Sequence, residues 1–271
     1  MTRAIIGIDI GSRYTKLCIM ESGVFRFIKL ETYSFYKEYT DKKGFAAKNL
    51  CQEHDILTSD TFFGFTGYGK HRIEKILNGR CNLFNELKMH MNGAIFQTGL
   101  KNFILLDIGG QDSKVIVVED GRMVDFETND RCASGTGRFI ENASRVMGME
   151  MTEFINCSDS PVEITSKCAV FAETEIIELL AENCLPKNIA AGINLSVVKK
   201  VLPLIERFNY NDNLIFTGGT ALNCAVVQYL AKMLSKRKIK VIVPEQPLFN
   251  GAIGVVRTLV EMEENNGYCT F

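Results

Sequence analysis

The 271-residue sequence lacks several patterns that would assign it to a common class of protein. Its 31 basic and 32 acidic side chains leave a formal net charge of −1, so composition does not favour nucleic acid or an anionic membrane as the main partner. No continuous apolar run approaches the roughly 18–20 residues that span a bilayer. The first acid, Asp9, comes too early for a secretory signal, and we therefore expect a cytoplasmic protein.

Two familiar site motifs are also missing. The sequence has no P-loop lysine motif, which excludes a P-loop ATPase. It has no CxxC pair, so a zinc ribbon or a thioredoxin-type site has no support. The nine cysteines are a high and odd number for a reducing compartment, where a disulfide framework is not expected. For most of them the simplest interpretation is a small buried hydrophobe, as for Cys18 within an apolar run.

A short sequence motif occurs twice, 98 residues apart, as DIGSRYTK at 9–16 and DIGGQDSK at 107–114. Each copy predicts a strand, a glycine turn and a second strand, with a carboxylate at the end of the first strand and bare backbone N–H groups beside it. Two such hairpins facing each other would form a cleft for phosphate and Mg²⁺. We therefore predict two related half-domains with a nucleotide between them. For either copy alone, an ordinary hairpin with aspartate in a turn is the alternative.

The residues of the two hairpins suggest separate roles. Asp9 and Asp107 are predicted to hold Mg²⁺, which usually keeps several waters and takes one or two carboxylates. Asp107, Gln111 and Asp112 are the predicted catalytic residues, and the last two would orient or deprotonate the attacking water. The predicted phosphate contacts are Gly11, Ser12, Thr15, Lys16, Gly109 and Gly110.

A third glycine site follows a later predicted strand. Gly218 and Gly219 would let the backbone lie flat against adenine and ribose, with Thr220 near a helix cap and Asn223 as a further cofactor contact. A Gly-Gly pair after a strand is a weak signal alone, since many α/β turns share it. The segment NGAIG at 250–254 opens the last predicted helix, where its glycines would permit close helix packing or a hinge.

Hydrophobic patterning predicts strands followed by helices, an α/β architecture. The region from about 31 to 60 has no clear periodicity, and no element is placed there. The expected strands lie near 4–10, 15–20, 24–29, 61–65, 103–108, 113–118, 123–127, 213–217 and 239–243. The expected helices lie near 70–78, 88–98, 134–147, 169–183, 188–208, 220–234 and 248–263.

The order of these motifs resembles the acetate kinase, sugar kinase, chaperone and actin superfamily (ASKHA). The resemblance spans most of the chain and implies an actin-like ATPase fold, with two ribonuclease-H-like half-domains that close over ATP. It implies a first half at 1–98, with the helix at 248–264 packing back on it, and a second half at 99–247 that carries the cluster cysteines. The tail at 265–271 is expected to fray.

Two cysteines precede predicted helices in matching contexts. Cys132 lies in NDRCASGTGRF at 129–139, and Cys168 lies in TSKCAVFAETE at 165–175. A helix N-terminus favours negative charge and lowers a thiol pKa, which suits a metal ligand. A 4Fe–4S cluster usually takes four thiolates, which a two-fold dimer sharing one cluster would supply. From spacing alone, two core cysteines at helix starts are an equal alternative.

These two segments closely resemble the ATP-dependent activators of 2-hydroxyacyl-CoA dehydratases. That family includes the ATPase subunits of benzoyl-CoA reductase and the reductases of double-cubane cluster proteins. Further matches are TGYG at 66–69, and Glu86 with HMNGA at 90–94. The region at 31–60 and the tail depart from the family, which bears on the partner and not on the ATPase.

The resemblance implies a homodimer in which Cys132 and Cys168 of each subunit ligate one bridging 4Fe–4S cluster. It implies that hydrolysis of ATP drives a low-potential electron from a donor such as ferredoxin or flavodoxin to an iron–sulfur dehydratase or reductase. Such a cluster would be labile to oxygen, which is consistent with an anaerobic host.

Two other functions fit the superfamily. A small-molecule kinase, for example one acting on an amino sugar, would tolerate loss of both cysteines. An actin-like or chaperone-like binding module ranks third, because the chain lacks the length for a substrate-binding domain.

His90 is interpreted as a partly buried helix residue that bonds a neighbouring carbonyl, and it receives no functional role.

Overall fold

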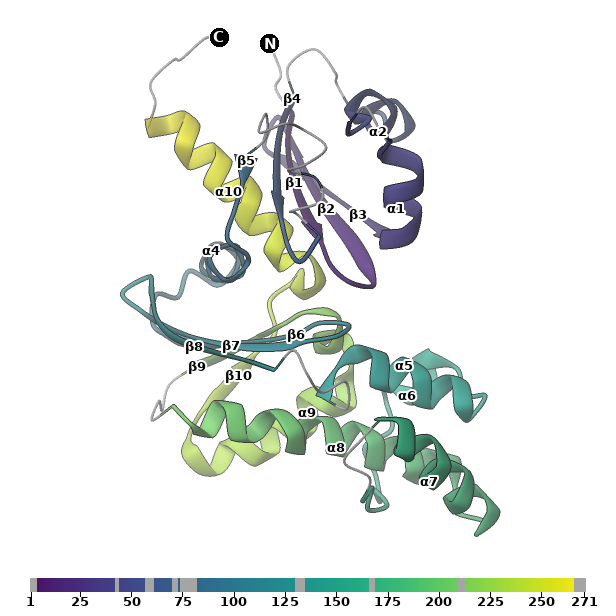
Figure 1. The fold of residues 1–271 in the computed structure, drawn as a ribbon. Coiled ribbons are helices and arrows are strands. Elements are labelled where there is room, and N and C mark those ends of the chain that lie inside the picture. Colours follow the sequence, from purple (N-terminus) through teal and green to yellow (C-terminus); the bar gives the residue numbers. More distant parts are fainter. Residues whose placement is uncertain are drawn as a thin grey trace. The chain divides into compact units, whose positions relative to one another are not determined.

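The chain forms two compact units, each built on one β-sheet (Figure 1). Unit 1 comprises the residues up to Gly99 and those from Leu248 onward, and unit 2 comprises Leu100–Pro247. The computed structural model describes residues 4–41, 44–56, 61–69, 73, 82–129, 135–165, 169–208 and 213–265.

The sheet of unit 1 has five strands in the order β3-β2-β1-β4-β5. The central strand β1 pairs antiparallel with β2 and parallel with β4, so a hairpin lies on one side of it and a crossover strand on the other. The strands are β1 (Ala4–Ile10), β2 (Tyr14–Glu21), β3 (Val24–Glu31), β4 (Thr61–Thr66) and β5 (Asn82–Leu83).

The sheet of unit 2 has the order β10-β9-β6-β7-β8, and it corresponds strand for strand to the sheet of unit 1. Its central strand β6 pairs antiparallel with β7 and parallel with β9. The repeated sequence motif at 9–16 and 107–114 therefore lies in a repeated sheet. The strands are β6 (Phe103–Ile108), β7 (Ser113–Glu119), β8 (Arg122–Asn129), β9 (Asn213–Thr217) and β10 (Lys240–Ile242).

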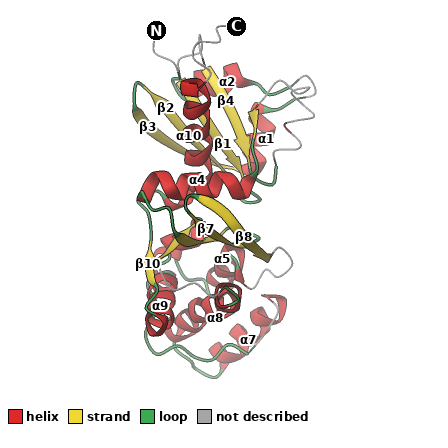
Figure 2. Ribbon diagram, turned by 90° about the vertical axis from the view of Figure 1, so that its left-hand side faces the viewer, coloured by secondary structure: helices red, strands yellow, loops and turns green. Residues whose placement is uncertain are grey.

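Helices cover both faces of the unit 1 sheet (Figure 2). Because side chains alternate along a strand, Ile6 and Ile8 of β1 pack with α1 and α2, whereas Ile5 packs toward α4 and α10. Gly7 shares the face of Ile5, and a Cβ there would fall on the carbonyl oxygen of Ala252 in α10. The helices are α1 (Thr32–Tyr39), α2 (Ala47–Glu53), α4 (Glu86–Thr98) and α10 (Asn250–Asn265).

The core of unit 2 packs its helices against the alternate side chains of β6, such as Ile104 and Leu106. Within the described ranges, α8 alone is long and apolar enough to span a membrane, but ten of its residues are buried, which accounts for its composition. The helices are α5 (Gly137–Val146), α6 (Met151–Phe154), α7 (Ala169–Ala181), α8 (Pro186–Glu206) and α9 (Cys224–Leu234). Three 3₁₀ turns, η2 (Gly219–Leu222), η3 (Ser235–Arg237) and η4 (Pro247–Phe249), complete the described elements.

The predicted α/β architecture is confirmed, and the predicted strands agree with the observed ones to within a few residues. The region at 31–60, in which no element was placed, contains α1 and α2. Neither helix has a side-chain cap, and α1 is rich in aromatic residues that are common in strands, so neither carried a sequence signal. The helix expected near 70–78 lies outside the described residues except for Ile73.

The crossing of α4 and α10 generates a stability prediction. A Cβ at Gly254 would fall on the carbonyl oxygen of Met89, so Gly254→Ala must push the two helices apart. We expect the unfolding free energy to fall by about 1–3 kcal/mol, even though alanine is more favourable than glycine in a helix by up to about 1 kcal/mol. Urea denaturation measures it, with the exposed Glu261→Ala of α10 as control. Equal stability of both variants would contradict the close crossing.

Candidate functional site

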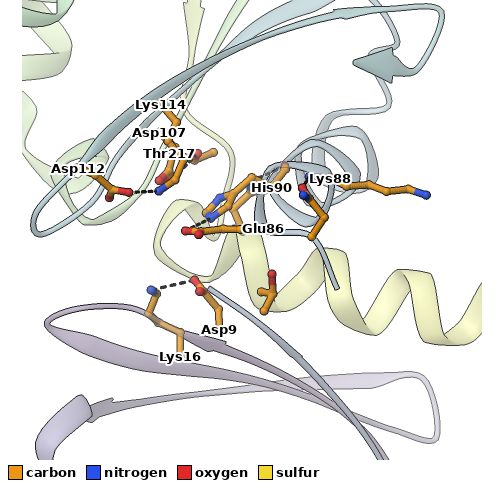
Figure 3. A network of polar contacts seen from close by, with 12 residues as sticks. Asp9, Lys16, Glu86, Lys88, His90, Asp107, Asp112, Lys114 and Thr217 are labelled. Carbon is orange, nitrogen blue, oxygen red and sulfur yellow. Dashed lines mark hydrogen bonds and ion pairs between the residues drawn. The ribbon is translucent and has the colours of Figure 1, made fainter. Parts of the chain in front are cut away.

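In unit 1 the hairpin register brings a carboxylate and a lysine together. Asp9 pairs with Lys16 across β1 and β2, and Lys16 Nζ lies 2.8 Å from Asp9 Oδ2 (Figure 3). Asp9 is buried, and the turn closes through a hydrogen bond from the Gly11 N–H to the Tyr14 carbonyl, 3.2 Å. Ser12 lies half-buried in this turn. A charged pair and a glycine turn thus occupy the carboxyl end of β1, where α/β sheets bind ligands.

Thr15 does not join this group. Alternation along β2 puts its side chain on the face opposite Lys16, where it is fully buried and its hydroxyl lies 3.1 Å from the Thr32 hydroxyl. The Thr32 hydroxyl in turn donates to the Gly11 carbonyl, 2.8 Å. Thr15 therefore helps to hold the turn through Thr32, and its donation to phosphate stays a prediction.

The second hairpin repeats this geometry in unit 2. Asp107 pairs with Lys114 across β6 and β7, and the Gly109 N–H donates to the Asp112 carbonyl, 2.9 Å, as Gly11 does in the first copy. The contacts of the lysines differ, because Lys114 Nζ lies 2.6 Å from Asp112 Oδ2. The buried Asp107 accepts a hydrogen bond from the Thr217 hydroxyl, 2.9 Å (Figure 3).

Two of the predicted catalytic residues lie in the loop of this hairpin. Gln111 is exposed and Asp112 is half-buried, so both are accessible to a ligand at the carboxyl end of β6. Gly110 lies half-buried beside them. The loop therefore offers an amide, a carboxylate and backbone groups at one point.

Three hydrogen bonds fix the second hairpin to the start of α5. The Gly137 N–H donates to the Gly109 carbonyl, 2.9 Å, and the Arg138 N–H donates to the Gly110 carbonyl, 3.1 Å. The Ser113 hydroxyl donates to the Gly135 carbonyl, 2.8 Å. The N–H groups of the first two residues of α5 are thus satisfied by carbonyls of the predicted phosphate loop.

The Gly-Gly turn after β9 is tightly constrained. Gly218 has a φ of +87°, and a Cβ there would fall on the Ile108 carbonyl, so only glycine fits. Its N–H donates to the Pro247 carbonyl, 2.9 Å. Gly219 then begins the 3₁₀ turn η2. In that turn the Thr220 hydroxyl is buried and has no hydrogen-bond partner among the described residues.

Asn223 caps α9. Its side-chain oxygen accepts from the Val226 N–H, 3.0 Å, and its amide donates to Asn194 of α8, 2.8 Å. The helix therefore begins at Cys224, and the expectation of a start near Thr220 is wrong because η2 precedes the cap. Asn223 is buried and held by these bonds at the end of the Gly-Gly turn, and its contact with a cofactor stays a prediction.

A positive-φ glycine recurs after β4 in unit 1, which sequence reasoning missed. Thr66 pairs with Asp9 as Thr217 pairs with Asp107, and Gly67 has the same φ of +87° as Gly218. The signal was present as the tripeptide Phe-Thr-Gly at 65–67 and again at 216–218. The duplication therefore includes the crossover strand as well as the hairpin.

The described cysteines are not ligand candidates as a group. Burial raises the pKa of Cys18 to about 12, and burial also raises the pKa of Cys51 and Cys157. Cys184 is half-buried. Cys224, at the first position of α9, is exposed, although most cysteines were expected to be buried. Cys132 and Cys168, the expected cluster ligands, lie outside the described residues.

No group of three or more histidine, cysteine, aspartate or glutamate side chains within the described ranges is arranged to hold a metal ion. Each unit nevertheless presents one buried carboxylate, Asp9 or Asp107, at the end of its central strand. Mg²⁺ bound to a nucleotide needs only one or two carboxylates, because waters and phosphates complete its coordination. The donor chemistry of the chain therefore fits this ion.

Two characterised relatives match nearly the whole chain. The 2-hydroxyisocaproyl-CoA dehydratase activator of Clostridioides difficile is 32% identical over 262 residues, covering 92% of this chain and 92% of the relative. The (R)-2-hydroxyglutaryl-CoA dehydratase activating ATPase of Acidaminococcus fermentans is 32% identical over 255 residues, covering 92% and 94%.

A solved structure agrees with the fold. The activator of the 2-hydroxyisocaproyl-CoA dehydratase from Clostridium difficile with bound ADPNP superposes with a TM-score of 0.83 at 30% identity, covering 100% of this chain and 99% of that one. The predicted actin-like fold of two ribonuclease-H-like halves is thereby confirmed. The family described as the BadF/BadG/BcrA/BcrD ATPases matches residues 6–256, and the chain belongs to this family.

Proposed function

We propose that the chain is an ATP-hydrolysing iron–sulfur electron donor that drives single-electron transfer at low potential to a partner enzyme, such as a 2-hydroxyacyl-CoA dehydratase. Membership of an ATPase family supports the hydrolysis, and relatives named as dehydratase activators support the kind of partner. A relative from Thauera aromatica, named as one of the subunits of benzoyl-CoA reductase, extends the class of partners to reductases.

One observation carries the proposal: the predicted phosphate loop of unit 2 is hydrogen-bonded to the start of α5. The carbonyls of Gly109 and Gly110 and the hydroxyl of Ser113 make these bonds. In the sequence, Cys132 lies three residues before Gly135. A change at the phosphate loop is therefore transmitted through short backbone contacts to the segment that carries a proposed cluster ligand.

The nucleotide site follows from the two hairpins. Asp9 and Asp107 would hold Mg²⁺, which would in turn bind the phosphate oxygens. Lys16 would offset phosphate charge, and the N–H groups of the glycine turns would donate to the same oxygens. Gln111 and Asp112 would orient the attacking water, since positioning and electrostatics account for most of the catalysis of phosphoryl transfer.

The iron–sulfur site rests on the cysteine chemistry of the chain. Cys132 and Cys168 each precede a described helix, α5 or α7, and two copies of the chain would offer four thiolates. When bound, a 4Fe–4S cluster would supply a one-electron carrier of low potential. The protein's own part is to hold the thiolates at helix N-termini and to shift α5 when the phosphate loop changes.

The remaining partners follow from this role. A homodimer is required because one chain offers two matching thiolates. The electron would come from a ferredoxin or flavodoxin and pass to an iron–sulfur dehydratase or reductase. We place these reactions in the cytoplasm of an anaerobic cell.

The first prediction concerns Asp107. Replacing it with asparagine removes a charge while keeping the shape that Thr217 contacts, so ATP turnover should fall roughly 100-fold or more. Steady-state phosphate release by the purified full chain measures this. Asp125→Asn, at an exposed position of β8 in the same unit, is the matched control. If Asp107→Asn and the control hydrolysed ATP equally fast, the second hairpin would not be the phosphate site.

The second prediction concerns iron. Anaerobically purified protein should contain one 4Fe–4S cluster per dimer, and Cys132→Ala or Cys168→Ala should remove it while the fold survives. Iron content and the visible spectrum report the cluster, with the exposed Cys224→Ala of unit 2 as control. Purification without iron, or a full 4Fe–4S spectrum from Cys132→Ala, would refute the proposal in favour of a kinase of the same superfamily.

The third prediction concerns the link to α5. Ser113→Ala removes the hydrogen bond to Gly135 and should abolish the effect of ATP on the rate at which a chelator extracts iron, while iron content stays unchanged. The control Ser144→Ala deletes a comparable bond near the other end of α5, where the hydroxyl donates to the Met149 carbonyl, 2.6 Å. An unchanged ATP effect in Ser113→Ala would mean that this bond does not couple the two sites.

A further inference from the structure

His90, to which the sequence assigned no role, lies beside the carboxylate of Asp9 in unit 1. Its side chain is only 6% exposed, on α4. Gly251 of α10 shows how close the two groups are, because a Cβ at that position would lie 3.0 Å from Asp9 Oδ2 and 3.2 Å from His90 Nε2. The carboxylate and the imidazole therefore converge on one point at the first turn of α10.

This close approach is possible because glycines lie next to Asp9. Asp9 shares its face of β1 with Ile5 and Gly7, the face that α10 covers. On the other side of the carboxylate, a Cβ at Gly67 would lie 2.5 Å from Asp9 Oδ1. Both carboxylate oxygens are thus bordered by a glycine, and Gly251 in particular leaves the space that the imidazole faces.

The position of His90 is itself fixed from several directions. Asn250 Nδ2 donates to the His90 carbonyl, 2.8 Å, and Asn250 Oδ1 accepts from Gln97 Nε2, 2.9 Å. A Cβ at Gly93 would fall on the Asn250 carbonyl, so α4 and α10 are in close contact here. On the same helix, Glu86 Oε1 lies 4.0 Å from His90 Nε2 (Figure 3). The imidazole is therefore held in place by helix packing and not by a flexible loop.

The geometry points to a positioning role for His90: it fixes the carboxylate of Asp9 in the orientation that receives Mg²⁺-nucleotide. This inference rests on the proposed nucleotide site. Mg²⁺ takes oxygen ligands, so the imidazole is assigned to orienting the carboxylate and not to binding the ion. Lys16 restrains Asp9 Oδ2 from one side, and His90 restrains the same region from α4.

Restraint of the Asp9 carboxylate would strengthen the binding of Mg²⁺. The ion demands near-ideal octahedral geometry, so a carboxylate free to rotate binds it less well than one that is held. Partners that orient a metal-binding side chain commonly contribute about 10-fold to 100-fold in metal affinity. Loss of the imidazole should therefore affect the metal-dependent part of nucleotide binding and spare the metal-independent part.

The experiment titrates a fluorescent ADP analogue into the full-length dimer, once with Mg²⁺ and once with EDTA. His90→Ala should weaken binding about 10-fold or more in Mg²⁺ and leave binding in EDTA unchanged. His90→Gln, whose amide can donate near the position of Nε2, should restore most of the loss. His54→Gln is the matched control, because its imidazole belongs to the same unit but contacts the hydroxyl of Tyr39, 3.3 Å.

A second variant tests the same geometry if His90→Ala fails to fold. Gly251→Ala keeps the imidazole but inserts a methyl group between it and Asp9, and it should give the same selective loss in Mg²⁺. Equal losses in Mg²⁺ and EDTA, or a glutamine variant no better than alanine, would overturn the positioning role while leaving the proposed function intact. If the wild-type protein bound the nucleotide equally well in Mg²⁺ and in EDTA, both the proposed Asp9 site and the role of His90 would be overturned.

Discussion

The cross-strand pairing of an aspartate with a lysine at the open end of a hairpin is the constraint on which the site depends. Antiparallel register fixes Asp9 opposite Lys16 and Asp107 opposite Lys114. A slip of one residue would turn every side chain of the strand to the other face and remove the carboxylate from the site. The side chains of β1 oppose such a slip, because its alternate positions are buried in separate cores.

The two units share a topology but use it differently. Lys16 contacts Asp9 directly, whereas Lys114 contacts Asp112, which has no counterpart carboxylate in the first hairpin because Tyr14 occupies that position. The second loop is bonded to the start of α5, as the first loop is bonded to the start of α1 through Thr32. The two hairpins thus share a bond to a following helix and differ in their charged contacts.

The sequence predicted most of the fold because long apolar strands and glycine turns leave local signals. It predicted the hairpins and the Gly-Gly turn for the same reason. It could not show that the Thr15 side chain is buried on the face opposite Lys16, since that depends on which face of β2 each core occupies. It could not show that His90 lies near Asp9, because the two groups meet at Gly251, which is distant in sequence and has no side chain. The cap formed by Asn223 could not be told from a cofactor contact, because both use the same residue type.

The return of α10 to the first sheet has a consequence for how the protein is made. The face of β1 that packs on α10 stays partly uncovered until α10 leaves the ribosome, because α10 is synthesised long after β1. Unit 2 is continuous in sequence, so it can complete its core earlier. We therefore expect the second half of the protein to fold before the first, with Ile5 and Cys18 exposed during synthesis. A chain stalled before α10 would present this apolar surface to chaperones.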